Sequence, residues 1–241
     1  MTLSASSCLA RNTWICGAYL NTRSADILAA LRQHVILTVI SVAIGFVVAL
    51  PLSLLARRIR RTESWVLGVT TALYTIPSLA MFSLLLPFTG LTRATVIIGL
   101  VLYSLTILVR NTIAGLDGVP EDVREAARGM GYGNTRLLLQ VELPLATPSI
   151  LAGLRIATVS TVALATVGAI VGYGGLGNLI YDGLPSFFKA EVLTASVLCV
   201  LLAIAADLLL LGLQRVLTPW RQRASDRAAA PEPQPTLEPV Q

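Results

Sequence analysis

The chain has 241 residues, of which 55% are hydrophobic and 13% charged, and its mean hydropathy is +0.75. Soluble domains carry about 25% charged residues, so this composition excludes an ordinary water-soluble domain. The net charge of +5 does not require a nucleic-acid partner, because the positive residues lie between long apolar runs, where they orient a membrane protein.

The apolar residues form five runs that are long enough, or nearly so, to cross a bilayer. A hydrocarbon core about 30 Å thick needs roughly twenty apolar residues in helical conformation. We expect spans at residues 35–56, 65–88, 92–109, 148–172 and 192–213. The third is short, but its flanking arginines can extend to the interface. The chain is therefore predicted to be an all-α membrane protein with about five transmembrane helices.

The second expected span contains two prolines, Pro77 and Pro87. Proline removes a backbone hydrogen bond and can kink a membrane helix where neighbours satisfy the freed carbonyl. We expect a bend near Pro77, with Ser78 beside it in mid-membrane. Two interpretations stay open: the kink and its hydroxyl line a translocation path, or the kink is purely structural.

A polar segment at residues 111–142 carries too many charges for hydrocarbon and is predicted to lie in water. Pro120 suits a helix start and Gly129 or Gly131 a helix end, so we expect a helix of about ten residues between them. Its small-residue face would carry Val123, Ala126, Ala127 and Met130 at i, i+3, i+4 and i+7. A second helix should begin with Asn134 as its N-cap and end at Leu143 and Pro144.

The arginines predict the orientation of the chain. With the amino terminus outside, twelve of the eighteen Lys and Arg residues fall on the cytoplasmic side. These are Arg57, Arg58, Arg60, Arg61, Arg110, Arg124, Arg128, Arg136, Arg215, Arg221, Arg223 and Arg227. The positive-inside rule then places the polar loop and the carboxyl terminus in the cytoplasm.

The three cysteines and one histidine do not form a metal-binding pattern, and no metal or cofactor is expected. Cys8 and Cys16 would form a disulfide in an oxidising compartment or remain thiols, and the sequence leaves both open. His34 is expected at a membrane boundary, where no hydrolytic triad can be assembled around it. The first thirty residues lack the apolar core of a cleaved signal peptide.

Two charges fall inside expected spans, Arg155 in the fourth and Asp207 in the fifth. At about 1.5 Å of rise per residue, both lie on the order of 10 Å inside the cytoplasmic boundary. We predict an ion pair that holds the two spans together, the alternative being that each side chain reaches the interface separately. A glycine-rich tract, GYGGLG at residues 172–177, lacks the preceding strand of a nucleotide-binding loop and is interpreted as a re-entrant turn.

The polar loop resembles a known family. Glu125, Ala126 and Ala127 are followed after three residues by Gly131, and after nine more by Val141, with Leu143 and Pro144 at the end. This spacing is similar to the EAA loop of binding-protein-dependent ABC permeases, with valine in place of isoleucine. TIPSLA at residues 75–80, AGLR at 152–155 and the GYGGLG tract resemble the osmoprotectant branch, although amino-acid and methionine permeases share them in part.

The resemblance implies a division of roles along the chain. Residues 34–215 would be a permease domain of the type I importer fold. The arginine distribution predicts that residues 1–33 are an external segment and residues 216–241 a cytoplasmic tail, and the composition of the tail predicts that it is largely disordered. The segment around Glu125, Met130 and Gly131 would be a coupling helix seated in a separate ATPase subunit. ATP hydrolysis would belong to that subunit, and this chain would have no catalytic residue.

The same resemblance implies partners and a solute. The partners would be the ATPase, a second permease subunit, an external substrate-binding protein and the lipid bilayer of a bacterial cell membrane. The solute would be glycine betaine, carnitine or choline. Two alternatives stay open: a permease for methionine or another amino acid, and an ion-coupled secondary transporter, which would call for buried carboxylates or inverted repeats.

Overall fold

The computed structural model describes residues 8–220, and in that part of the chain the regular elements are all helices. In chain order these are α1 (Gly17–Thr22), α2 (Ser24–Arg58), α3 (Arg60–Thr75), α4 (Ser78–Thr89), α5 (Arg93–Asp117), α6 (Glu121–Gly129), α7 (Asn134–Leu137), the π-helical η1 (Leu138–Glu142), α8 (Leu143–Ala165), the 3-10 helix η2 (Thr166–Val171), α9 (Leu176–Gly183) and α10 (Lys189–Leu217). The cytoplasmic-tail prediction falls mostly on residues 221–241, outside the described part.

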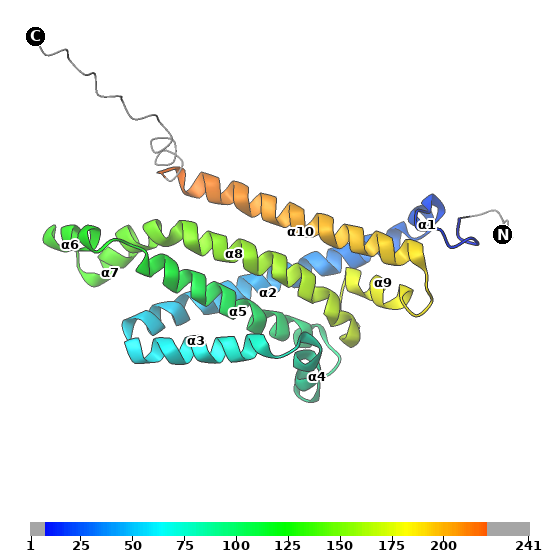
Figure 1. The fold of residues 1–241 in the computed structure, drawn as a ribbon, viewed down its shortest axis with the longest axis horizontal. Helices are drawn as coiled ribbons and strands as arrows, with labels where there is room; N and C mark the ends of the chain where they lie inside the picture. The colour runs from blue at the N-terminus through cyan, green and yellow to red at the C-terminus, as the bar shows by residue number, and fades with distance from the viewer. Residues whose placement is uncertain (1–7, 221–241) are drawn as a thin grey trace, which may run out of the picture.

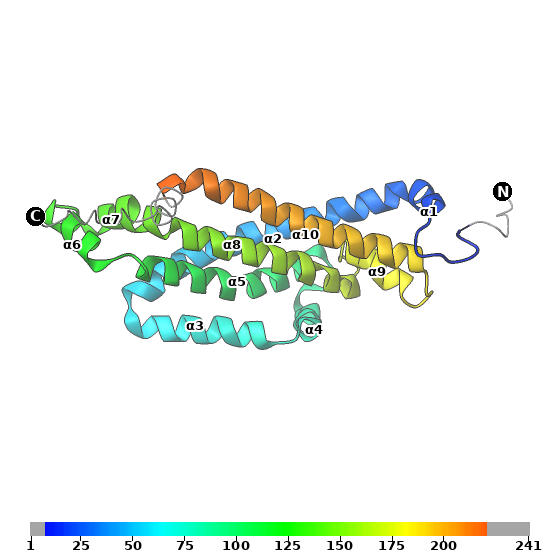
Figure 2. The ribbon, with the colours of Figure 1, turned by 45° about the horizontal axis from the view of Figure 1, so that its top comes forward.

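The long helices α2, α5, α8 and α10 run along one axis, as Figures 1 and 2 show. Helix α3 lies beside α5, and α4 crosses the bundle axis. Helices α6 and α7 form one end of the bundle, which we call the loop end, while α1 and α9 lie at the opposite end. Four helices are long and apolar enough to cross a membrane, or five spans if the bent pair α3–α4 counts as one. The all-α prediction with about five spans is confirmed.

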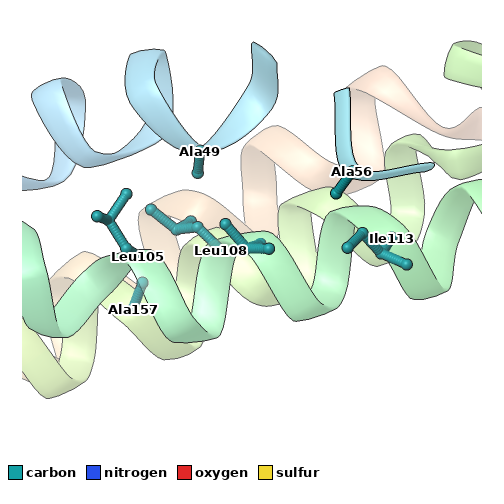
Figure 3. Close-up of a cluster of buried hydrophobic side chains, with 7 residues drawn as sticks. Ala49, Ala56, Leu105, Leu108, Ile113 and Ala157 are labelled. Atoms are coloured by element: carbon teal, nitrogen blue, oxygen red, sulfur yellow. The ribbon is translucent and has the colours of Figure 1, made fainter. Parts of the chain in front are cut away.

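The core is built where α2, α5 and α8 meet. Ala49 and Ala56 of α2 face Leu105, Leu108 and Ile113 of α5, with Ala157 of α8 beneath them (Figure 3). Small residues let helices approach closely in a membrane, where packing rather than water exclusion drives association. A Cβ on Gly45 would lie 2.2 Å from the Ser104 hydroxyl oxygen, and one on Gly153 would lie 2.4 Å from the Asn111 Cβ.

The first and third spans are longer than predicted. Helix α2 begins at Ser24 rather than near residue 35, and α5 continues to Asp117. The polar residues after Arg110 therefore do not begin a loop. Thr112, Ile113 and Leu116 are buried, and the Ser149 hydroxyl of α8 donates to the Asn111 carbonyl at 3.1 Å. These contacts keep the segment helical where hydropathy alone predicted an exit into water.

The bend predicted near Pro77 is a sharp break. Helix α3 ends at Thr75, α4 begins at Ser78, and the two axes differ by 99°. Ile76 and Pro77 are extended, and the Tyr103 hydroxyl of α5 donates a hydrogen bond to the Ile76 carbonyl. Proline cannot supply the N–H that would continue α3, and Tyr103 satisfies the carbonyl at the break.

The prediction that a helix ends at Leu143 and Pro144, and that a separate span starts near Pro148, is wrong. Residues Asn134–Val171 form one continuous run of helix. The ring of Pro144 would clash with the carbonyl of Gln140 in a regular α-helix. A π-helical turn at Leu138–Glu142 changes the spacing of the carbonyls before Pro144, so the helix continues through this proline, and Pro148 lies further along in α8.

His34, which the sequence suggested at a membrane boundary, is a fully buried packing residue. Its Nε2 lies 3.0 Å from the Val162 carbonyl of α8, and its Nδ1 accepts the Leu176 N–H at 3.3 Å. This pattern requires the neutral ring with its proton on Nε2. Because a Cβ on Gly175 would lie 2.6 Å from the His34 Cβ, glycine is what lets the GYGGLG turn pack against α2.

Candidate functional site

The loop end presents the short helix that the sequence predicted. Helix α6 spans Glu121–Gly129, after Pro120 and with Glu121 and Asp122 in its first turn. The expected small-residue face is divided between two environments. Ala127 is buried against the bundle, whereas Ala126 is exposed and Met130 is 71% exposed. Glu125 is exposed and forms no ion pair with any of residues 8–220.

Gly131 ends this helix as predicted. It has φ +83°, and its N–H donates to the Arg128 carbonyl at 2.9 Å while the Tyr132 N–H donates to the Ala127 carbonyl at 3.1 Å. These two bonds form a Schellman motif, in which the residue after the C-cap is left-handed and is usually glycine. Helix α7 then begins at Asn134, but its N-cap is Gly133 and Asn134 makes no capping side-chain bond, so the predicted cap was displaced by one residue.

Glu142 anchors the loop end, and sequence reasoning missed it. It is a buried carboxylate on η1, and Arg57 at the end of α2 donates two hydrogen bonds to it, at 2.9 and 3.0 Å. The Nε of Arg124 on α6 lies 2.9 Å from Glu142 Oε1, which is ion-pair distance. This Nε–H makes no hydrogen bond to the carboxylate. One carboxylate therefore connects α2, α6 and the π-helical turn.

The same arginines extend the network to neighbouring elements. Arg57 Nε donates to Asp117 at 3.0 Å, and Arg124 donates to the Leu116 carbonyl at 2.6 Å, so the end of α5 is included. Glu121 accepts bonds from Arg124 and Arg128 at 2.8 and 2.9 Å. The Arg124 guanidinium, and then Arg128, lower the pKa of the Glu121 carboxyl below its usual range. The only sequence signal for this network was a run of charges too dense for lipid.

A hollow of about 800 Å³ lies under this network, between the end of α2 and the α6–α7 segment. Its lining includes Arg57, Arg58, Arg128, Leu137 and Glu142. Leu143 and Pro144, the last residues of the predicted motif, lie half-buried in the helix above it. The motif thus forms an exposed short helix, a glycine turn and an anchored return helix.

The intramembrane pair predicted from the sequence is present. Arg155 of α8 donates to both carboxylate oxygens of Asp207 on α10, at 2.9 Å each. Gln214, about two turns further along α10, accepts a bond from Arg155 and donates one to the Pro148 carbonyl. Bidentate pairing of this kind fixes geometry as well as charge.

The opposite end of the bundle carries a disulfide between Cys8 and Cys16, which the sequence had left open. Asn12 bonds the Phe187 carbonyl and the Lys189 N–H at 2.8 and 3.0 Å, joining the amino-terminal segment to the α9–α10 turn. Tyr19 stacks edge-on against Phe188 at 5.2 Å. Burial, followed by the charge of Glu191, raises the pKa of Tyr19 to about 12.

Residues 33–223 match the family described as binding-protein-dependent transport system inner membrane component. The chain belongs to this family. It is 36% identical over 208 residues to the glycine betaine/carnitine/choline transport system permease protein OpuCD of Bacillus subtilis, an alignment that covers 86% of this chain and 91% of that one. It is 37% identical over 202 residues to the osmoprotectant import permease protein OsmW of Salmonella typhimurium, covering 81% and 94%.

Solved structures support the same permease fold. The methionine ABC transporter MetNI, in an inward-facing conformation, has a chain that matches with a TM-score of 0.71 at 23% identity, covering 80% of this permease and 96% of that chain. An amino acid ABC transporter determined with histidines matches with a TM-score of 0.69 at 18% identity, covering 83% and 98%. The chain is therefore a transport permease with several membrane-spanning helices, and its family relatives are transport subunits rather than enzymes.

Proposed function

We propose that this permease subunit forms the translocation path of an ATP-driven importer for a quaternary ammonium compatible solute: glycine betaine, carnitine or choline. The support is the match over most of the chain to permeases that carry those solutes in their names, at 36% identity for OpuCD of B. subtilis and 32% for its choline permease OpuBB. The methionine and amino-acid transporters are below 25% identity and support the fold alone.

Helix α6 is the proposed contact with a separate cytoplasmic ATPase subunit, which would hydrolyse the ATP. The main support for this proposal is that one side of this short helix is anchored to the bundle while its other side is exposed. Its inner side is anchored through Arg124 to Glu142, while Glu125, Ala126 and Met130 are exposed. Small side chains permit close approach of a partner backbone, and Glu125 is available for a charge-assisted bond to a partner arginine.

The proposed orientation puts the amino terminus outside and the loop end in the cytoplasm of a bacterial cell. The arginine-rich ends of α2 and α6 support it through the positive-inside rule. An independent observation agrees, because the Cys8–Cys16 disulfide lies at the end of the bundle opposite α6, and disulfides persist in oxidising compartments. An external binding protein would deliver the solute at that end.

The path itself is proposed to run between this subunit and a second permease subunit, either another copy or a related chain. The break between α3 and α4 at Ile76 and Pro77, directly before Ser78, interrupts the bent pair that would form one span. Non-helical backbone within a membrane is tolerated where it lines a cavity or is buried in protein. Coupling helices moved by the ATPase would then tilt the spans between inward-open and outward-open arrangements.

Two measurements test this function. The assembled transporter in proteoliposomes should import labelled glycine betaine or choline only with ATP and its binding protein, and ATP-independent uptake would refute the mechanism. Glu125→Arg should release the ATPase subunit during co-purification and abolish uptake. Asp182→Arg, an exposed site on α9 at the opposite end, is the matched charge reversal and should leave co-purification unchanged.

Orientation is tested by cysteine labelling. In a variant with Cys16→Ser and Cys199→Ser, the freed Cys8 thiol should react with a membrane-impermeant maleimide while the inner membrane is intact. Met130→Cys in a cysteine-free background should react only after permeabilisation. The reverse pattern would overturn the proposed orientation and, with it, the coupling role of α6.

A further inference from the structure

A second hollow, of about 320 Å³, opens within the membrane part of the bundle. It lies between α3, α5 and α8 and is lined by Thr71, Tyr74, Thr106, Ile107, Arg110, Asn111 and Ile156. Most of these groups are polar or aromatic, although lipid-facing surfaces are apolar. Apolar atoms make up most of the exposed lining, but a charged side chain within a span faces a protein interior or a water-filled cavity rather than lipid. The hollow is therefore a candidate part of the path.

Arg110 brings a positive charge to this hollow. It lies seven residues before the end of α5, about 10 Å along the helix. Its guanidinium donates to the Thr71 hydroxyl at 2.8 Å, and no carboxylate of residues 8–220 lies within ion-pair distance of it. By contrast, Arg155 on the neighbouring helix is neutralised by Asp207. An exposed guanidinium without a counter-ion within a span offers a binding group for a carboxylate.

Tyr74 supplies a second, different binding surface one helical turn from Thr71. The residue is 45% exposed, and its ring packs edge-on against Tyr103, with centroids 6.0 Å apart. Tyr103 is in turn fixed by its bond to the Ile76 carbonyl, and Thr106 donates to the Thr70 carbonyl at 2.5 Å. The wall that carries Tyr74 is therefore held in place. An aromatic face attracts a quaternary ammonium group through its quadrupole.

We propose that this hollow is a low-affinity site for a zwitterion with a quaternary ammonium and a carboxylate, the ammonium against Tyr74 and the carboxylate at Arg110. The two groups are adjacent because Arg110 bonds Thr71 and Thr71 lies three residues before Tyr74, on the same helix face. Asn111 borders the same end of the hollow. The inference rests on the proposed function and adds a preference for carboxylate-bearing solutes within the permease itself.

The test compares two solutes in the complete reconstituted transporter with its ATPase and binding protein. Glycine betaine carries a carboxylate and choline does not. Arg110→Gln should lower the initial uptake rate of glycine betaine at least about tenfold, as expected for loss of a charged hydrogen bond, while leaving choline uptake within about twofold. Tyr74→Leu should lower uptake of both solutes several-fold, and Tyr74→Phe should retain most of it because the ring is kept.

Arg215→Gln is the matched control, since Arg215 is exposed near the end of α10 and does not border the hollow. Co-purification of the ATPase with each variant checks that the permease still folds and assembles. Equal uptake of both solutes by Arg110→Gln and wild type, or an equal loss for both, would overturn the site. A wild-type transporter that imports choline but no carboxylate-bearing solute would overturn this site and leave the proposed function standing. A transporter that imports no quaternary ammonium would refute the proposed function itself.

Discussion

Arg57 and Glu142 are 85 positions apart in the sequence, yet two parallel hydrogen bonds of 2.9 and 3.0 Å join them at the loop end. Arg57 is the penultimate residue of α2, and Glu142 is the last residue of the π-helical turn. The pair links the first membrane helix to the segment that returns from α6. Because Arg124 of α6 also lies 2.9 Å from Glu142, α6 is connected to the bundle through charged contacts as well as through the backbone.

Replacing Glu142 with glutamine should destabilise the permease more than any other single acidic substitution in the loop. The Glu142 side chain is 9% exposed and that of Arg57 22%, and removing one partner of such a pair costs about 3 kcal/mol because the other charge is left unpaired. The thermal unfolding midpoint of the purified subunit measures this. Glu121→Gln, whose side chain is 56% exposed, should shift it far less. Equal shifts would contradict the anchoring role, and a cycle with Arg57→Gln should be non-additive.

Gly131→Ala should cost about 1–2 kcal/mol, the penalty for a left-handed residue that has a Cβ. No atom lies within 4 Å of the position where that Cβ would be, so backbone strain is the whole effect. Gly129→Ala is the matched control: it has equal space and a helical backbone, and should be neutral or slightly stabilising. Unfolding midpoints of the two variants decide the matter, and similar losses for both would argue against the Schellman turn.

Gly175→Ala should be far more damaging than Gly172→Ala. Both glycines have positive φ, so both substitutions carry the left-handed penalty of about 1–2 kcal/mol. Only at residue 175 would the new Cβ also press on His34, 2.7 Å from its backbone nitrogen, and we expect a total loss of about 3 kcal/mol or more. Purified yield and unfolding midpoint provide the comparison. If the two variants behave alike, the close approach of the turn to α2 is not what requires glycine.

Tyr19 should ionise near pH 12 rather than near 10. Burial is the main cause and the neighbouring Glu191 charge the second, and both favour the neutral phenol in the folded state. Its contribution to stability is therefore fully present below pH 10 and is lost as the pH rises from 10 through about 12. The difference in tyrosinate absorbance between wild type and Tyr19→Phe, recorded directly after an alkaline pH jump, isolates this group. Ionisation of Tyr19 near pH 10, the ordinary value for tyrosine, would contradict its burial.

The sequence by itself determined the membrane class, the approximate position of every span and the motif of the family. These features depend on local composition and spacing, because an apolar run of about twenty residues is stable in a bilayer whatever its neighbours are. The short helix α6, the turn at Gly131 and the break at Pro77 were predicted for the same reason. Each depends on the conformational limits of one proline or glycine.

Apart from the Arg155–Asp207 pair, which was predicted from the sequence, only the tertiary structure decided which polar residues bond to one another. Hydropathy ended the third span near Arg110, but contacts with α8 keep α5 helical to Asp117. Proline rules ended a helix at Pro144, but the π-helical turn before it lets the helix continue. His34, Arg57 and Glu142 had no distinguishing local pattern, since the bonds of His34 and the Arg57–Glu142 pair span 85 or more positions of the chain. Long-range pairing of buried polar groups is set by how the helices pack, and that packing cannot be read from any one segment of the chain.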